Sequence, residues 1–205
     1  MPDSLDQHVS WTRSEWSSNP YMSNVVSFLE KVGIESFIDA GGCTGEFTKI
    51  MLERIPSIKL AVILEPVPEN YQFIKSNLSD ERVTVINKAL YQTKKTISLG
   101  RVDANVGGWS VNYEGSETYE CVSVEELVEK YSPDFMKIDI EGAERDVIEN
   151  SSALSGVEFL EIEFHDQYVD PSAWREYVSK YLPDHTVVLA GDSWCSQNGF
   201  LVRNA

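Results

Sequence analysis

Charged and apolar residues alternate in the segment FMKIDIEGAERD, residues 135–146. A β-strand puts every second side chain on the same side, so Lys137, Asp139 and Glu141 are expected to share one face of a strand. Burying these charges against apolar neighbours would be destabilising. The alternation therefore predicts that polar groups or a ligand lie opposite this face.

The segment FLEIEFH, residues 159–165, repeats the arrangement with Glu161, Glu163 and His165. In a parallel sheet, ligands bind at the carboxyl ends of the strands, where Glu163 and His165 would lie. Glu161 lies near the start of its strand, as Lys137 does in the first segment. We expect these two residues to form a buried ion pair, because either charge alone in the interior would be costly.

Carboxylates and an imidazole at this edge of the sheet could position a hydroxyl group and remove its proton. Glu141, Glu163 and His165 are the candidates for the base and for positioning an acceptor. Asp139 is expected to orient the donor or the acceptor. His165 is the natural base near neutral pH, although a histidine after a strand is as often a structural hydrogen-bonding residue. The same residues could bind a divalent metal ion, but the sequence has no compact ligand motif.

The segment FIDAGGCTGEF, residues 37–47, has the order strand, glycine turn and helix start, which lets backbone N–H groups approach a ligand. A dinucleotide fingerprint would read GxGxxG. Here Gly41, Gly42 and Gly45 follow Asp39, which is still on the strand. A carboxylate at that point repels a pyrophosphate and suits the amino and sulfonium groups of S-adenosyl-L-methionine. The turn therefore favours this donor over NAD.

Glu65 lies twenty positions beyond Gly45, at the end of the second strand and directly before Pro66. A carboxylate there can accept hydrogen bonds from both ribose hydroxyls of either cofactor. Asn87 and Ala89 follow the third strand and are placed to meet the adenine. Asn87 fits an ordinary turn residue equally well.

Hydrophobic periodicity predicts that strands and helices alternate along the chain. An α/β fold follows, with a parallel sheet, right-handed crossovers and helices on both faces. The last two strands are expected to form an antiparallel hairpin. A segment at 94–122 with short β-like pieces is expected to be a small insertion or an antiparallel edge. Helices are expected at 22–33, 46–55, from Pro68, at 123–131, from Ala143 and after Pro171, and strands at 36–42, 59–65, 82–87, 134–140, 157–164, 185–191 and 199–204.

The composition fits one ordinary globular unit of 205 residues, of which 42% are hydrophobic and 24% charged. The formal net charge of -16 opposes binding to nucleic acids and anionic membranes, so neither is expected as a partner. No apolar run has the length of a membrane span, and the N-terminus lacks the features of a signal peptide. A cytoplasmic location is therefore expected, with the three scattered cysteines as ordinary thiols.

Five motifs resemble the FkbM family of S-adenosyl-L-methionine-dependent methyltransferases: DAGGCTGEF, LEP at 64–66, NKAL at 87–90, VSVEELVEKY at 122–131 and KIDIEGAE at 137–144. The resemblance covers roughly residues 35 to 165. It implies the Rossmann-like, seven-stranded class I methyltransferase sheet and O-methylation of a small hydroxylated acceptor, such as a sugar or a secondary metabolite. The family usually has Ala-Asn where this chain has Gly42-Cys43. This departure leaves open a cofactor-binding module that has lost transferase activity and acts as a partner or regulator.

The resemblance also implies a methyltransferase domain at 35–205, preceded by an N-terminal segment with its first helix at 1–34. It gives no oligomeric state. Glu144 belongs to the family-like motif, but its place in a first helical turn is explained by the helix dipole. The residues expected to bind the cofactor are Asp39, Gly41, Gly42, Thr44, Gly45, Phe47, Glu65, Pro66, Asn87 and Ala89.

Four tryptophans, Trp11, Trp16, Trp109 and Trp194, fall in stretches that the pattern predicts to be irregular. They are expected to seal the edges of the core, although aromatic side chains in such places can also stack on a sugar ring. The segment GGWS at 107–110 is a candidate for a mobile wall of the acceptor site.

Overall fold

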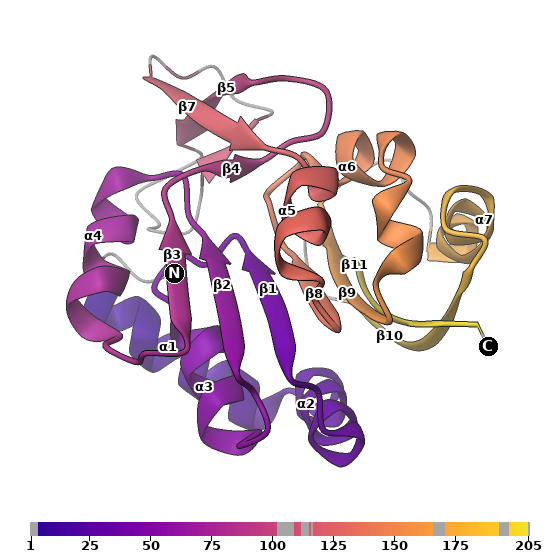
Figure 1. Cartoon of the computed structure of the whole chain (residues 1–205), viewed down its shortest axis with the longest axis horizontal. Helices are drawn as coiled ribbons and strands as arrows, with labels where there is room; N and C mark the ends of the chain where they lie inside the picture. Colours follow the sequence, from indigo (N-terminus) through magenta and orange to yellow (C-terminus); the bar gives the residue numbers. More distant parts are fainter. Residues whose placement is uncertain are drawn as a thin grey trace.

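The computed structural model describes residues 4–101, 109–111, 115, 117–165, 171–192 and 197–204, without the side chains of 15–17, 171–175 and 192. Its centre is a seven-stranded sheet in the order β10-β11-β9-β8-β1-β2-β3 (Figure 1). Six of these strands run in the same direction, and β11 runs opposite to them, between β10 and β9. The predicted parallel sheet with a final hairpin is therefore confirmed. The strands are β1 (Ser36–Ala40), β2 (Leu60–Leu64), β3 (Val83–Ile86), β8 (Phe135–Ile138), β9 (Phe159–Phe164), β10 (His185–Asp192) and β11 (Gln197–Arg203).

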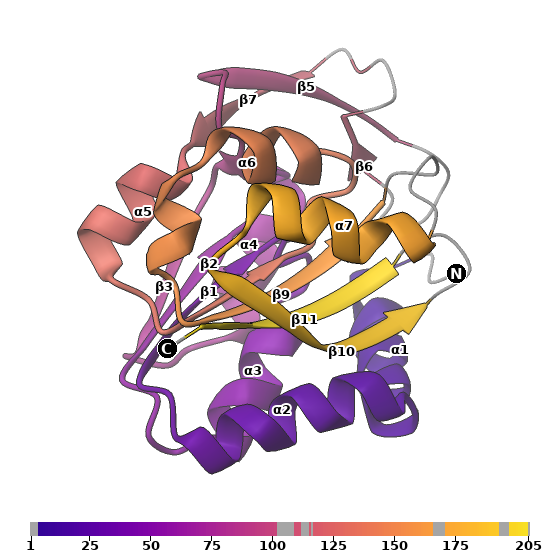
Figure 2. The ribbon, with the colours of Figure 1, turned by 90° about the vertical axis from the view of Figure 1, so that its right-hand side faces the viewer.

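Helices cover both faces of this sheet, as predicted (Figure 2). On one face, α2 (Pro20–Val32) and α3 (Glu46–Arg54) pack on an aromatic layer that the strands supply from alternate positions, which includes Phe37, Phe135 and Phe159. On the other face, the aliphatic side chains of the strands meet α5 (Val124–Tyr131), α6 (Glu144–Asn150) and α7 (Pro171–Tyr181). Both faces are apolar, which explains the near-continuous hydrophobic runs of the strands. The helix α4 (Pro68–Asn77) follows β2, and a short 3-10 helix spans Ala153–Gly156.

Helix boundaries follow local capping chemistry. The side chain of Asn19 accepts a hydrogen bond from the N–H of Tyr21 at the start of α2, and Gly33 ends this helix in the left-handed conformation with φ of 79°. Ser123 and Glu126 form the predicted capping box at the start of α5.

The predicted insertion at 94–122 is a second sheet, in the order β4-β7-β5-β6. It stands beyond the carboxyl ends of β1, β2 and β3 (Figure 1). A small apolar core that includes Ile97, Leu99 and Tyr119 stabilises it. Its strands are β4 (Ala89–Leu90), β5 (Thr96–Arg101), β6 (Trp109–Ser110) and β7 (Glu117–Val122).

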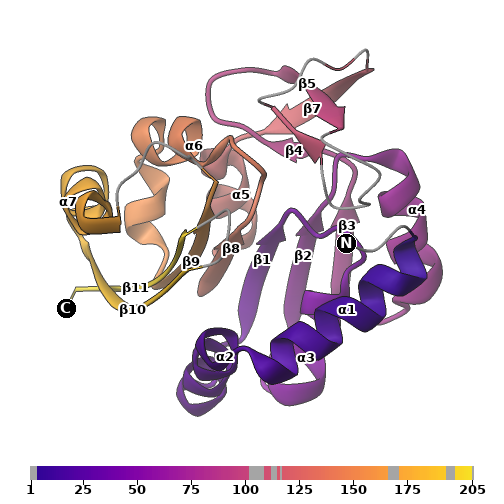
Figure 3. The ribbon, with the colours of Figure 1, turned by 180° about the vertical axis from the view of Figure 1, so that it is seen from behind.

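The helix α1 (Leu5–Ser18) was not predicted, and the expectation that Trp11 and Trp16 lie in an irregular stretch is wrong. Its sequence has no strong apolar stripe, so packing on the rest of the fold must stabilise it. Arg13 pairs with Glu46 and Glu53 on α3, and α1 runs across α3 (Figure 3). Trp109 lies in β6, whereas Trp194 and the glycines of GGWS lie outside the described residues.

The strand β8 ends at Ile138, which corrects the expectation that Lys137, Asp139 and Glu141 share one strand face. Glu141 has a left-handed backbone with φ of 53°, and Gly142 follows with φ of 104°. The Glu141 side chain therefore points in a different direction from the one that a continued strand would give it. Among the described residues, no helix has the length and hydrophobicity needed to cross a membrane.

Candidate active site

A cavity of about 310 Å³ opens at the carboxyl ends of the central strands. The turn after β1, the tips of β2, β8 and β9, the small sheet and α1 all contribute to its wall. This is the edge at which open α/β sheets bind their ligands, and the volume suits a small molecule.

The glycine turn after β1 is shaped by contacts inside the protein. Gly41 has φ of 88°, and a Cβ atom there would lie 1.7 Å from the backbone oxygen of Asp139, so only glycine fits between β1 and β8. The N–H groups of Gly41, Gly42 and Gly45 donate to backbone carbonyls, and that of Cys43 donates to the Glu65 carboxylate at 2.7 Å. A phosphate site requires free N–H groups. These four N–H groups are already used, so none of them is available to a pyrophosphate.

Asp39 lies beneath the turn and does not line the cavity. It is fully buried, one of its oxygens accepts a hydrogen bond from Thr48 Oγ1 at 2.8 Å, and burial raises its pKa. The carboxylate that faces the cavity from this side is that of Asp139, which lies 2.7 Å from Lys137 Nζ. Asp139, and not Asp39, therefore presents a carboxylate to the cavity.

Glu65 lines the cavity at the tip of β2. Besides the N–H of Cys43, it accepts hydrogen bonds from the N–H of Val67 at 2.8 Å and from Asn70 at 3.5 Å. Burial raises its pKa to about 8, against the effect of these hydrogen bonds. Each carboxylate oxygen has two lone pairs, so Glu65 retains acceptor capacity toward the cavity.

Some of the other predicted cofactor-binding residues line the cavity, and some do not. Asn87 donates to the backbone oxygens of Glu65 and Pro66 at 2.8 and 2.9 Å, and it is exposed and does not line the cavity. Gly45 lies behind the wall, where its φ of 74° begins α3. The predicted residues that line the cavity are Gly41, Gly42, Thr44, Phe47, Glu65, Pro66 and Ala89.

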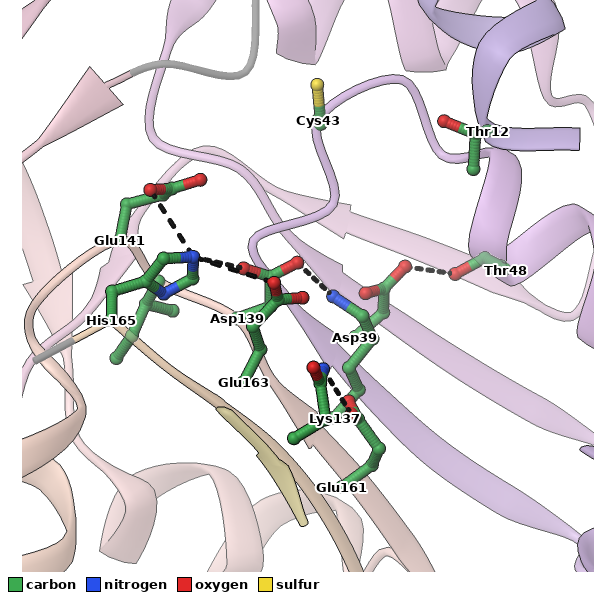
Figure 4. A network of polar contacts seen from close by, with 12 residues as sticks. Thr12, Asp39, Cys43, Thr48, Lys137, Asp139, Glu141, Glu161, Glu163 and His165 are labelled. Carbon is green, nitrogen blue, oxygen red and sulfur yellow. Dashed lines mark hydrogen bonds and ion pairs between the residues drawn. The ribbon is translucent and has the colours of Figure 1, made fainter. Parts of the chain in front are cut away.

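The four predicted catalytic residues converge at one end of the cavity (Figure 4). His165 Nε2 lies 3.5 Å from Glu141, 3.8 Å from Glu163 and 3.9 Å from Asp139. Glu141 and Asp139 follow β8, whereas Glu163 and His165 come from the end of β9. Adjacent parallel strands thus bring residues that are more than twenty positions apart into one cluster.

Glu144 is a functional candidate that the sequence assigned only to the helix dipole. It is 1% exposed, accepts hydrogen bonds from the N–H groups of Ile140 and Gly142, and lies 3.1 Å from His165 Nδ1. Its place in the KIDIEGAE motif was the available signal. Glu144 therefore fixes both the turn after β8 and the ring of His165.

The pKa values in this cluster change the expected roles. Burial opposes the charge of His165, but the hydrogen bond to Glu144 and the neighbouring carboxylates outweigh it and raise the pKa to about 11. His165 therefore keeps its proton at neutral pH and does not fit the predicted role of base. Burial raises the pKa of Glu141 to about 8, while the charge of His165 lowers it. Glu141 is thus the group that titrates near neutral pH.

The predicted ion pair between Lys137 and Glu161 is wrong. The two residues are register partners on β8 and β9, but the lysine side chain extends along the strand to Asp139. Glu161 instead accepts hydrogen bonds from Asn198 at 3.3 Å and Tyr21 at 3.4 Å. Burial raises the pKa of Glu161 to about 8.

The cluster does not fit a metal ion in this arrangement. Potential ligand atoms of Asp139, Glu141 and His165 lie within 4.8 Å of one another. Lys137 already occupies one oxygen of Asp139, and a protonated imidazole offers no lone pair to a metal. The two cations of the protein take the place that a metal would fill.

Several residues of the cavity wall were missed because their segments contain no family-like motif. They come from α1, from the start of α2 and from the final hairpin, and no spacing pattern in the sequence links them. The missed wall residues are His8, Trp11, Thr12, Asn19, Tyr21, Met22, Gly191 and Asn198.

Three solved structures are similar to this chain at the level of the fold. A methyltransferase FkbM from Methylobacillus flagellatus KT has a TM-score of 0.57 and 18% identity, over 81% of this chain and 43% of that one. A precorrin-6y C5,15-methyltransferase from Geobacter metallireducens GS-15 has a TM-score of 0.51 and 12% identity, over 89% of this chain and 87% of that one. A putative tRNA (m1A22) methyltransferase from Streptococcus pneumoniae was solved in complex with S-adenosyl-L-methionine. It has a TM-score of 0.51 and 15% identity, over 89% of this chain and 72% of that one.

This chain spans under half the length of the FkbM structure from Methylobacillus flagellatus. No curated protein matches the sequence. The family model of the methyltransferase FkbM domain matches residues 39–183, which contain the glycine turn, Glu65 and the whole carboxylate cluster. The match covers more than half of the chain, which therefore belongs to the FkbM methyltransferase family.

Proposed function

We propose that the protein is an S-adenosyl-L-methionine-dependent O-methyltransferase that acts on a hydroxyl group of a small, uncharged acceptor, such as a sugar or a secondary metabolite. The observation that carries this proposal is the shared cavity of the glycine turn and the carboxylate cluster. A cationic donor suits a cavity lined by Glu65, Asp139 and Glu141. A diphosphate would meet these acids and could not use the four N–H groups of the turn that are already bonded.

When bound, the cofactor supplies a methyl group on a sulfonium, and transfer breaks the carbon–sulfur bond, leaves its electron pair on sulfur and forms the carbon–oxygen bond of the product. Gly41, Gly42, Thr44 and Ala89 would hold the donor, and Glu65 would accept hydrogen bonds from its ribose. Asp139 would face the positive charge of the donor.

The protein's part in the chemistry is to orient the acceptor and take its proton. We assign the base to Glu141, because it reaches the cavity and titrates near neutral pH. His165 in its protonated form lies 3.5 Å from Glu141 and stabilises the carboxylate. Glu163, which also lines the cavity, would accept a hydrogen bond from a second acceptor hydroxyl.

The charge of this end of the cavity supports an uncharged acceptor. With Glu141 ionised, the three carboxylates of Asp139, Glu141 and Glu163 outnumber the two cations Lys137 and His165, and a phosphate or carboxylate on the acceptor would be repelled. One structural relative is a putative tRNA methyltransferase by name, but an RNA strand would meet both this acidic cavity and the formal net charge of -16.

Two measurements test the proposal. Calorimetry should detect binding of S-adenosyl-L-homocysteine and no response to NAD. Incubation with labelled S-adenosyl-L-methionine and a panel of sugars, hydroxylated metabolites and tRNA should give a gain of one methyl group on an uncharged acceptor by mass spectrometry. Binding of NAD alone would refute the proposal. Donor binding with no methylated product on a broad panel would favour the inactive binding module.

A further inference from the structure

We propose that α1 supplies two residues of the donor site, His8 and Trp11, so that the donor is enclosed between α1 and the carboxyl end of β8. This inference rests on the proposed function. Both side chains line the cavity, although α1 lies outside the part of the chain that the family model matches.

The ring of His8 lies directly on the glycine turn. Its Nε2 is 3.6 Å from Cys43 Sγ, and its Nδ1 is 3.4 Å from Thr44 Oγ1 and 3.2 Å from Thr12 Oγ1. The turn and α1 therefore form two adjoining sides of one cavity. A donor held by Gly41, Gly42 and Thr44 would contact His8.

Trp11 is a large aromatic residue with an exposed fraction of 44% at this cavity. Its ring centroid lies 5.5 Å from that of His8, with an angle of 56° between the planes. An exposed indole beside a cavity has area to bury and a face on which a ligand can pack.

The position of α1 is fixed relative to the turn. Arg13 pairs with Glu46 and Glu53, and Glu46 is the first residue of α3, directly after the turn. Thr12 is buried between these elements. The wall formed by α1 is thus in place before the donor binds, which lowers the ordering cost of binding.

The charge of His8 also suits the donor. Burial lowers its pKa, so the ring is neutral near pH 7 and does not repel a sulfonium. Asp139 and His8 both line the cavity, and the charge of Asp139 acts on His8. The methionine part of the donor would therefore pass between a neutral imidazole and a carboxylate.

The test is calorimetric titration of S-adenosyl-L-homocysteine into the wild type and into His8→Ala and Trp11→Ala. Loss of one aromatic contact should weaken binding about three- to tenfold in each variant. Ser10→Ala is the matched control, because Ser10 is exposed on the same helix and does not line the cavity. Its affinity should stay within about twofold of the wild type. Circular dichroism should show that all variants are folded.

The outcomes separate the two proposals. If the wild type does not bind S-adenosyl-L-homocysteine, the proposed function fails. If the wild type binds it and both aromatic variants bind within about twofold of the wild type, the role of α1 is refuted and the function stands.

A second ligand distinguishes direct contact from support of the turn. 5′-Methylthioadenosine lacks the amino-acid tail. His8→Ala should therefore weaken the binding of S-adenosyl-L-homocysteine more than it weakens the binding of 5′-methylthioadenosine. Equal losses for the two ligands would mean that His8 only stabilises the turn, and the proposed contact would be overturned.

Discussion

Glu144 and His165 are joined by a hydrogen bond of 3.1 Å between Oε1 and Nδ1, and the carboxylate is almost fully buried. This contact fixes which nitrogen of His165 faces the cavity and stabilises the protonated ring. A histidine that looks like a base in the sequence is therefore the cation of the site.

Glu144→Gln should lower the pKa of His165 from about 11, because the substitution removes the charge that most favours the imidazolium. The raised pKa stabilises the folded state below the unfolded histidine value near 6.5, and this contribution is lost as the pH rises through the folded value. NMR titration of the labelled histidine ring gives the pKa directly. A wild-type His165 that titrates near 6.5 would contradict the assignment.

Glu141→Gln should reduce methyl transfer by about 10²- to 10⁴-fold and leave the affinity for S-adenosyl-L-homocysteine unchanged. Because the pKa of Glu141 is raised to about 8, the wild-type rate should increase with pH and level off above that value. Glu141→Gln should lose this rise. The measurement is kcat/KM against pH with the acceptor that the panel identifies. An unchanged pH profile in the variant would remove Glu141 as the base.

Glu65→Ala should weaken binding of S-adenosyl-L-homocysteine at least about tenfold, since the ribose loses its acceptor and the turn loses the bond from Cys43. Asp39→Asn keeps the shape of a residue that lies behind the wall, so it should change the affinity little. Calorimetry on both variants shows which of the two acids contributes to the affinity for S-adenosyl-L-homocysteine. A large loss in Asp39→Asn alone would restore the role that the sequence assigned to Asp39.

Gly41→Ala should destabilise the protein by at least about 1–3 kcal/mol, because φ is 88° and the new Cβ would lie 1.7 Å from the Asp139 carbonyl oxygen. Gly156→Ala is the matched control, since no atom lies within 4 Å of its added Cβ and its backbone is not left-handed. Denaturant unfolding of the two variants and the wild type gives the change in the free energy of unfolding for each substitution. Equal stability would mean that the turn relaxes freely.

The order of strands and helices, the parallel sheet and the edge at which polar residues gather could all be predicted from the amino-acid sequence. These features depend on local periodicity and capping, as in the Ser123 capping box, which neighbouring residues decide. The convergence of Asp139, Glu141, Glu163 and His165 followed from the rule that parallel strands end at one edge, although Asp139 and Glu141 lie beyond β8 and not on its face.

The partner of each buried charge could not be predicted, because it depends on the three-dimensional packing. Lys137 could reach Glu161 or Asp139, and the choice depends on side-chain direction within a packed interior. The proton on His165 depends on acids from separate segments, and burial sets how strongly they act. Helix α1 was not predicted for the same reason: it packs on the rest of the fold and forms ion pairs with α3, which lies more than thirty residues away along the chain. Long-range contacts leave no local pattern to read.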